Sequence, residues 1–211
     1  MKVRLLLAVA ALAFVSCKKE KSQEDPFKGQ TCDYAPYSDG ATFSYNMVDG
    51  TSDTLRFSLK ATGDSTLNGE VWRVLEDMDD GTKGLFRCGN GMYEQFADFS
   101  GIPGAPADPV RSVYLRENVN LGGSWTEMML IDIPMAGSVN ATITHTIMQK
   151  GTAKEVAGQR FESVIGVRTE VSVPPLVPAQ TVLTSFYAKG VGLIEADTET
   201  DTTYIVSYNI P

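Results

Sequence analysis

The side chains with the widest chemical scope are few in this chain of 211 residues. His145 is the only histidine, so a metal site built from several histidines is excluded. A serine hydrolase of the nucleophile-elbow type is not indicated, because the sequence contains no Gly-x-Ser-x-Gly segment. His145 is in phase with Ile143 and Ile147, which predicts that it faces the interior from a strand. We therefore expect a core histidine, and a protein that is not an enzyme.

The acidic run from Glu76 to Asp80 is the densest group of carboxylates in the chain. Carboxylates at such close spacing are typical Ca²⁺ ligands. The twelve-residue calcium loop is nevertheless not matched, because Gly81 comes one place too early and Cys88 stands where the closing Glu is required. The Asp80-Gly81 pair is a strong hairpin signal. We expect a solvated turn here, with no metal and no cofactor.

The N-terminal segment has the pattern of a secretory signal peptide. Lys2 and Arg4 precede an apolar run from Leu5 to Val15. This run is shorter than the ~20 apolar residues that a transmembrane helix needs. A short positive region followed by a short apolar region is typical of a signal for export. Small Ser16 suits a cleavage site, so we expect residues 1–16 to be removed.

The residues Phe14-Val15-Ser16-Cys17 resemble the lipobox of bacterial lipoproteins, although Phe14 stands where Leu is usual. The resemblance implies that the Cys17 thiol takes a diacylglycerol, that the signal is cut before Cys17, and that the new amine is acylated, as with palmitate. More than one acyl chain gives stable anchoring, because each buried CH₂ contributes ~0.8 kcal/mol. An ordinary signal peptide with an incidental cysteine is the alternative.

Two further cysteines remain if Cys17 is acylated. Cys32 and Cys88 would then stand in an exported chain, where the compartment permits disulfides. A Cys32–Cys88 bridge would fasten the start of the mature domain to a strand. The alternative is two free thiols, one of them a small hydrophobic core residue.

The charge of the chain limits its partners. Acidic residues outnumber basic ones by 26 to 18, giving a formal net charge of −8, and cleavage of the signal removes Lys2 and Arg4 as well. A strongly acidic protein repels nucleic-acid phosphates and gains no attraction to anionic lipid. We expect no nucleic-acid partner, and membrane attachment through the acyl chains.

Residues 17–30 have the composition of a flexible tether. The segment is polar, with a single aromatic residue, and cannot bury enough surface to order itself. Its start, Lys18-Lys19-Glu20, resembles the signals that follow the anchor cysteine in Bacteroidetes surface lipoproteins. The two resemblances imply a lipid-anchored protein of the bacterial outer membrane, on its periplasmic or its cell-surface face.

Residues 31–211 are expected to form a single β domain. Alternation of apolar and polar residues predicts strands and no helix of ten residues. Gly63-Asp64-Ser65 is interpreted as a turn, and Tyr204, Val206, Tyr208 and Ile210 as one face of the last strand. About eleven strands are predicted: 54–61, 70–76, 84–88, 92–96, 110–115, 124–129, 139–150, 161–173, 181–188, 191–196 and 202–210.

The turns between these segments are short, so neighbouring strands should pair as antiparallel hairpins. A long meander must curl or close to protect its edges. We predict an all-β fold: a strongly curved antiparallel meander sheet or open barrel, with a two-sheet β-sandwich as the alternative.

Three segments of the C-terminal half resemble an uncharacterised set of Bacteroidetes-type outer-membrane lipoproteins with a YAKGVGL-like strand pair. They are Asn120–Trp125, Val156–Val164 and Tyr187–Ile194. The resemblance concerns fold and implies no known chemistry; the set is loosely similar to β-rich periplasmic carriers of lipoproteins and lipids. The glycines of these segments suit turns or bulges with positive φ.

Three functions remain open from the sequence. The first is a lipid-anchored, non-enzymatic β domain that binds an apolar ligand or a partner protein, in which the concave face of the sheet should be apolar and partly open. The second is a structural or accessory subunit of an envelope complex, which predicts an exposed flat patch. The third is a hydrolase acting on glycans or peptides, which needs convergent acids in a groove.

Overall fold

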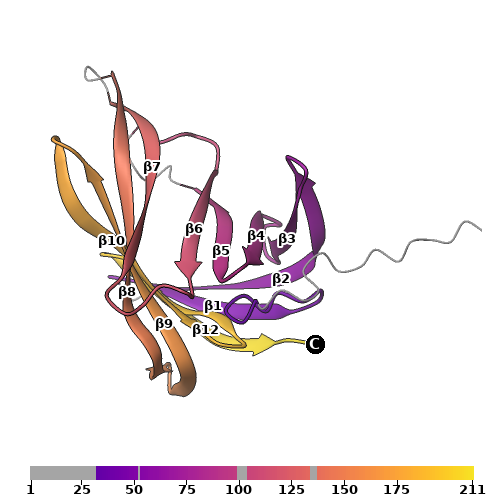
Figure 1. Ribbon diagram of the computed structural model, residues 1–211. Coiled ribbons are helices and arrows are strands. Elements are labelled where there is room, and N and C mark those ends of the chain that lie inside the picture. Colours follow the sequence, from indigo (N-terminus) through magenta and orange to yellow (C-terminus); the bar gives the residue numbers. More distant parts are fainter. Residues whose placement is uncertain (1–31, 52, 99–103, 134–136) are drawn as a thin grey trace, which may run out of the picture.

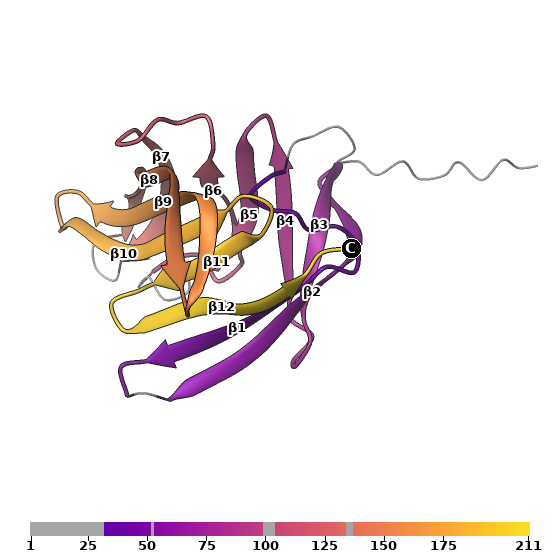
Figure 2. The same ribbon diagram turned by 90° about the horizontal axis from the view of Figure 1, so that it is seen from below.

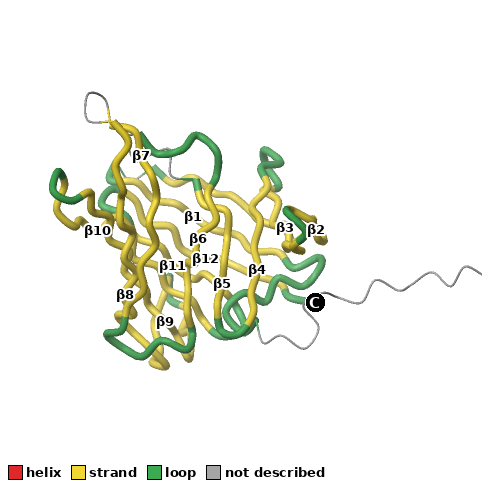
Figure 3. The backbone as a smooth tube through the Cα atoms, turned by 45° about the horizontal axis from the view of Figure 1, so that its top comes forward, coloured by secondary structure: helices red, strands yellow, loops and turns green. Residues whose placement is uncertain are grey.

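The computed structural model describes residues 32–51, 53–98, 104–133 and 137–211. Cys17, the expected signal peptide and the expected tether lie outside these ranges. Every regular element of the described part is a strand (Figure 3), and no helix in it is long and apolar enough to span a membrane. The strands are β1 (Thr42–Asp49), β2 (Thr54–Leu67), β3 (Glu70–Asp77), β4 (Lys83–Gly89), β5 (Met92–Ala97), β6 (Val110–Arg116), β7 (Ser124–Ile133), β8 (Gly137–Val156), β9 (Gln159–Val173), β10 (Val177–Ala188), β11 (Gly192–Asp197) and β12 (Asp201–Asn209).

The twelve strands form one antiparallel sheet in the order β6-β5-β4-β3-β2-β1-β12-β11-β10-β9-β8-β7. Strands that are neighbours in the sequence are neighbours in the sheet, and β1 pairs with β12. The sheet curls until its edges, β6 and β7, approach each other (Figures 1 and 2). The result is a nearly closed barrel with one unsealed seam. The all-β open barrel is therefore confirmed, and the two-sheet sandwich is wrong.

The inward face of β8 illustrates why these segments become strands. Ala141, Ile143, His145 and Ile147 alternate with partly exposed residues and are at most 4% exposed. A side chain such as Ile gains about 1.5–3 kcal/mol when it is fully buried. Alternation thus fixes which face of β8 turns inward, and the prediction for His145 is confirmed.

The predicted turn at Gly63-Asp64-Ser65 is wrong. β2 continues to Leu67, and its pairing with β3 shifts register between Ala61 and Asp64. Gly63 has a φ of +107°, which glycine adopts without a steric penalty. The glycine therefore allows a bulge that bends the strand and keeps it paired.

The prediction that Tyr204, Val206, Tyr208 and Ile210 share one face of the last strand is also wrong. Ile205 is fully buried, whereas Tyr208 is 44% exposed. The ladder between β1 and β12 shifts register between Ser44 and Tyr45, so that Tyr45 lies opposite Ile205. This shift displaces the alternation along β12 by one residue.

Buried side chains occupy the inside of the barrel. One cluster gathers residues such as Phe43, Leu75, Ile194 and Ile205 from both halves of the sheet. A second joins β4–β6 to β7–β10, and a third lies under β7, β8 and β9. In the described ranges the concave face is thus packed along much of its length, where the sequence led us to expect it partly open, and a pocket lies at one end of the barrel.

Candidate functional site

The segment from Cys32 to Ser38, which we call the strap, crosses one end of the barrel before β1 begins. Tyr34 and Ala35 are buried in the cluster that joins the two walls. The Tyr34 hydroxyl donates to the Ser163 carbonyl on β9 at 3.0 Å. The amide of Gly190, in the β10–β11 turn, donates to the carbonyl of Asp33 at 2.6 Å. The strap is thereby fastened to the wall that carries β9–β11.

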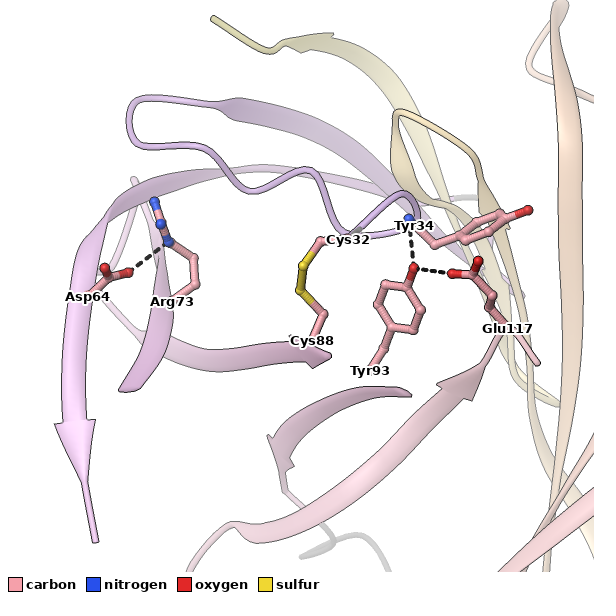
Figure 4. Close-up of a disulfide and its surroundings, with 7 residues drawn as sticks. All are labelled: Cys32, Tyr34, Asp64, Arg73, Cys88, Tyr93 and Glu117. Carbon is pink, nitrogen blue, oxygen red and sulfur yellow. Dashed lines mark hydrogen bonds and ion pairs between the residues drawn. A yellow bond between two sulfur atoms is a disulfide. The ribbon is translucent and has the colours of Figure 1, made fainter. Parts of the chain in front are cut away.

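The strap is joined to the opposite wall by a covalent bond. Cys32 and Cys88, the latter on β4, form a disulfide with their Cα atoms 5.8 Å apart (Figure 4). Beside it, the Tyr93 hydroxyl accepts a hydrogen bond from the Tyr34 amide at 3.3 Å and donates one to Glu117 at 2.7 Å. The strap therefore bridges the barrel from wall to wall.

A glycine lies against the far side of the strap. Gly192 begins β11 with a φ of +99°. A Cβ at this position would lie 3.5 Å from the ring of Tyr37. Tyr37 also packs edge-on against Phe43 and Phe86, with ring centroids 5.4 and 5.3 Å away. The Gly190-x-Gly192 pattern thus serves the positive φ values of the turn between β10 and β11.

A pocket of about 310 Å³ opens between the strap, β3, β4 and the C-terminal residues, and we call it the strap pocket. Cys32, Ser38, Arg73, Arg87 and Cys88 contribute to its lining. Most of its remaining surface is apolar and comes from Ala35, Pro36, Tyr37, Phe86, Ile210 and Pro211.

Both arginines of the strap pocket take part in ion pairs. Arg73 Nε lies 2.8 Å from Asp64 Oδ1 (Figure 4). Arg87 pairs with Glu70, which also pairs with Arg111 at 2.8 Å. The pKa of Glu70 is lowered by the hydrogen bond from Arg87 and by the charge of Arg111. The hydrogen bond from Arg87 outweighs burial, which acts to raise this pKa. Both arginines thus have carboxylate partners within the protein.

Tyrosines gather in the strap and beneath it. Burial raises the pKa of Tyr187 to about 12, and burial also raises the pKa values of Tyr37, Tyr45 and Tyr114. The Tyr45 hydroxyl donates to the Leu193 carbonyl at 3.1 Å. These phenols stay protonated at neutral pH and act as packing and hydrogen-bonding groups.

His145 lies at the seam, far from the strap in sequence. Its Nε2 is 3.3 Å from Glu127 Oε2, and its Nδ1 is 3.0 Å from Thr169 Oγ1. Its ring stacks on Trp125 with centroids 5.0 Å apart. The expectation of a hydrogen-bonded core histidine is met, because both ring nitrogens have partners within the protein.

The acidic run from Glu76 to Asp80 covers the end of β3 and the first part of the exposed β3–β4 turn that the sequence predicted. Asp77 Oδ1 accepts from the Asp79 amide, and Asp80 Oδ1 accepts from the Thr82 amide, at 2.8 and 2.7 Å. The carboxylates thus hold their own turn. Across the described ranges, no three His, Cys, Asp or Glu side chains are gathered as a metal site.

Sequence reasoning did not find the strap, its pocket or the partners of His145. Cys32–Ser38 carries no alternation, and its two tyrosines and one proline were the only signals that it packs. Glu127 was missed because a single acid within a strand resembles an outward-facing residue. Only the closing of the barrel brings Glu127 to β6.

Comparisons with known proteins concern the fold. No family model and no curated protein matches the chain. A solved structure from Bacteroides fragilis, named as an exported protein with a YmcC-like fold, covers 82% of this chain and 97% of its own, at 9% identity and a TM-score of 0.48. The lipoprotein YmcC from Escherichia coli covers 86% and 91%, at 10% identity and a TM-score of 0.37. Neither likeness is strong enough to carry an argument about function.

Proposed function

We propose that the protein is a lipid-anchored, non-enzymatic protein of the bacterial outer membrane, whose β domain binds a small apolar ligand in the strap pocket. The observation that carries the proposal is the pocket itself. Its volume of about 310 Å³ and its mostly apolar lining match the lower range of ligand sites. The Cys32–Cys88 disulfide in its wall holds two sides of the pocket at a fixed separation.

The non-enzymatic part of the proposal rests on His145. The side chain is 4% exposed and bonded through both ring nitrogens, so it has no free position from which to exchange a proton with a substrate. Asp64 and Glu70, the carboxylates that pair with the two arginines of the strap pocket, are held in these ion pairs.

The anchor is tested at Cys17. In cells fed a labelled palmitate, the parent chain should carry the label and Cys17→Ala should carry none, because the thiol is the site at which lipidation begins. In cell fractionation the variant should be absent from the membrane pellet, because a strongly acidic chain without acyl groups gains no attraction to anionic lipid. Label that persists on the Cys17→Ala chain would refute the anchor.

The pocket is tested by filling it. Ser38 is exposed at the rim of the strap pocket, so Ser38→Trp can place an indole in the pocket without disturbing the core. A hexyl diazirine, photoactivated with the full chain in nanodiscs, should label peptides containing Tyr37 and Phe86. We expect Ser38→Trp to reduce this labelling roughly tenfold, equivalent to about 1.4 kcal/mol of lost affinity.

Ser138→Trp is the matched control, because Ser138 is exposed at the start of β8 and does not line the pocket. It should leave the labelling unchanged. Equal labelling of both variants would contradict the pocket and favour the alternative of an envelope-complex subunit. Met128 and Leu130, which are 78% and 59% exposed on the edge strand β7, are the surface that supports this alternative.

A further inference from the structure

The seam between β6 and β7 is closed mainly by side chains. These two strands end the sheet, and no ladder pairs them in the described ranges. Elsewhere around the barrel, adjacent strands share main-chain hydrogen bonds. The seam is therefore the one place in the described wall whose closure depends on particular residues.

Three ties hold the seam along its length. At the strap end, Lys150 Nζ donates to the carbonyls of Glu117 and Val119, both at 2.8 Å. At the opposite end, the Asp132 amide donates to the carbonyl of Gly104 at 2.8 Å. The third tie lies between them and joins the two edge strands directly.

The central tie satisfies both main-chain groups of one β6 residue. The Val113 amide donates to Glu127 Oε1 at 2.8 Å, and the Val113 carbonyl accepts from Trp125 Nε1 at 2.9 Å. Ser112 Oγ donates to the other oxygen of Glu127 at 2.7 Å. Two side chains of β7 thus take the place that the main chain of a neighbouring strand would fill.

A second layer holds this tie in position. Because a carboxylate only accepts hydrogen bonds, His145 Nε2 must donate to Glu127, while His145 Nδ1 is hydrogen-bonded to Thr169 Oγ1. Trp125 stacks on His145, and Arg116 Cζ lies 5.9 Å from the Trp125 ring. Rotation of Glu127 out of the seam would break several of these contacts together.

We propose that the β6–β7 seam is a built-in opening of the barrel and that Glu127 is the latch that keeps it closed. Release of the latch frees Val113 on β6 and uncovers Trp125, both of which belong to the cluster that joins the two walls. The proposal is independent of any ligand in the strap pocket.

A fall in pH should release this latch. Burial alone would raise the pKa of Glu127, but hydrogen bonds from His145, Ser112 and Val113 together lower it. A carboxyl group with a lowered pKa contributes stability above its ordinary pKa, and this contribution is lost as the pH falls through the lowered value. The charged and titratable groups around the latch are His145 on β8 and Arg116 on β6. The seam should therefore open first as the pH falls below about 4.

The test is amide hydrogen exchange on the full chain at neutral pH. Glu127→Gln keeps the shape and removes the charge, so exchange at Val113 should become about 10- to 100-fold faster, because hydrogen bonds to charged groups are the strong ones. The effect should be confined to β6 and β7. Glu195→Gln is the matched control: it removes the partner of Lys154, 2.8 Å away, between β8 and β11, and should leave Val113 unchanged.

A second pair of variants tests the proposal if Glu127→Gln does not fold. Trp125→Phe removes the indole donor at the seam, whereas Trp72→Phe alters the other, equally buried tryptophan, whose Nε1 has no partner among the described residues. Only Trp125→Phe should speed exchange at Val113. In the parent chain, protection at Val113 should fall on acidification before that of β11 and β12, and Glu127→Gln should abolish this difference. Unchanged exchange at Val113, or an equal increase on all strands, would overturn the proposal.

Discussion

Replacing Cys32 and Cys88 together by serine should lower the melting temperature of the protein by about 10 °C. The disulfide joins residues 56 positions apart, and closing a loop of that length removes conformational entropy from the unfolded chain. The entropic stabilisation is about 4 kcal/mol, the largest single contribution that we assign to one bond of this protein. Differential scanning fluorimetry of the parent and the double variant measures it.

The other ties of the strap should survive this substitution. The bonds from the Gly190 amide to Asp33 and from the Tyr34 hydroxyl to Ser163 do not pass through the disulfide. We therefore expect a native β-sheet spectrum for the double variant at room temperature, and the same melting temperature as for the fully reduced parent chain. If the double variant has the same melting temperature as the oxidised parent chain, the disulfide contributes nothing to stability.

Truncation of Ile205 to alanine should cost about 2–5 kcal/mol of unfolding free energy, because the side chain is fully buried in the main cluster and its loss leaves a cavity. Tyr208→Ala should cost far less, because Tyr208 is 44% exposed and its contacts are already shared with water. Urea denaturation of the two variants measures the difference.

The two variants, compared with Val206→Ala, test the register of β12. Ile205 lies opposite the buried Tyr45, and the partly buried Val206 has no partner in the β1 ladder. A ladder without the shift between Ser44 and Tyr45 would place Val206 opposite Tyr45, and Val206→Ala would then be the costly change. A loss of stability for Val206→Ala as large as that for Ile205→Ala would contradict the register described.

The sequence predicted the strands and their meander because both depend on local information. Alternation in segments such as 139–150 reports which side chains turn inward, and a short turn leaves the next strand no other neighbour. The bulges at Gly63 and at the β1–β12 ladder were not predictable in this way. Each inserts one residue into a pattern of period two, and the pattern does not reveal whether the chain turns or stays paired.

The sites were less predictable than the strands because they join residues that are distant in sequence. Glu127 acquires its role only when β7 reaches β6 from the opposite edge of the sheet. His145 could be assigned to the interior by its phase, but its partner could not be identified. The Cys32–Cys88 pair was recognised as a candidate because an exported chain with two remaining cysteines offers a single pairing.

The strap also determines where mechanical load enters the protein. Cys32 precedes β1 in the chain, yet its disulfide leads directly to β4. A pull applied from the N-terminal side therefore passes through a covalent bond into β4, the third strand from the β6 edge of the sheet. β1, which the chain enters next, lies outside this load path, so its hydrogen bonds with β2 and β12 are not unzipped one at a time. A domain held by its N-terminus against drag or crowding at a membrane would be pulled as a whole and would not be unravelled from its first strand.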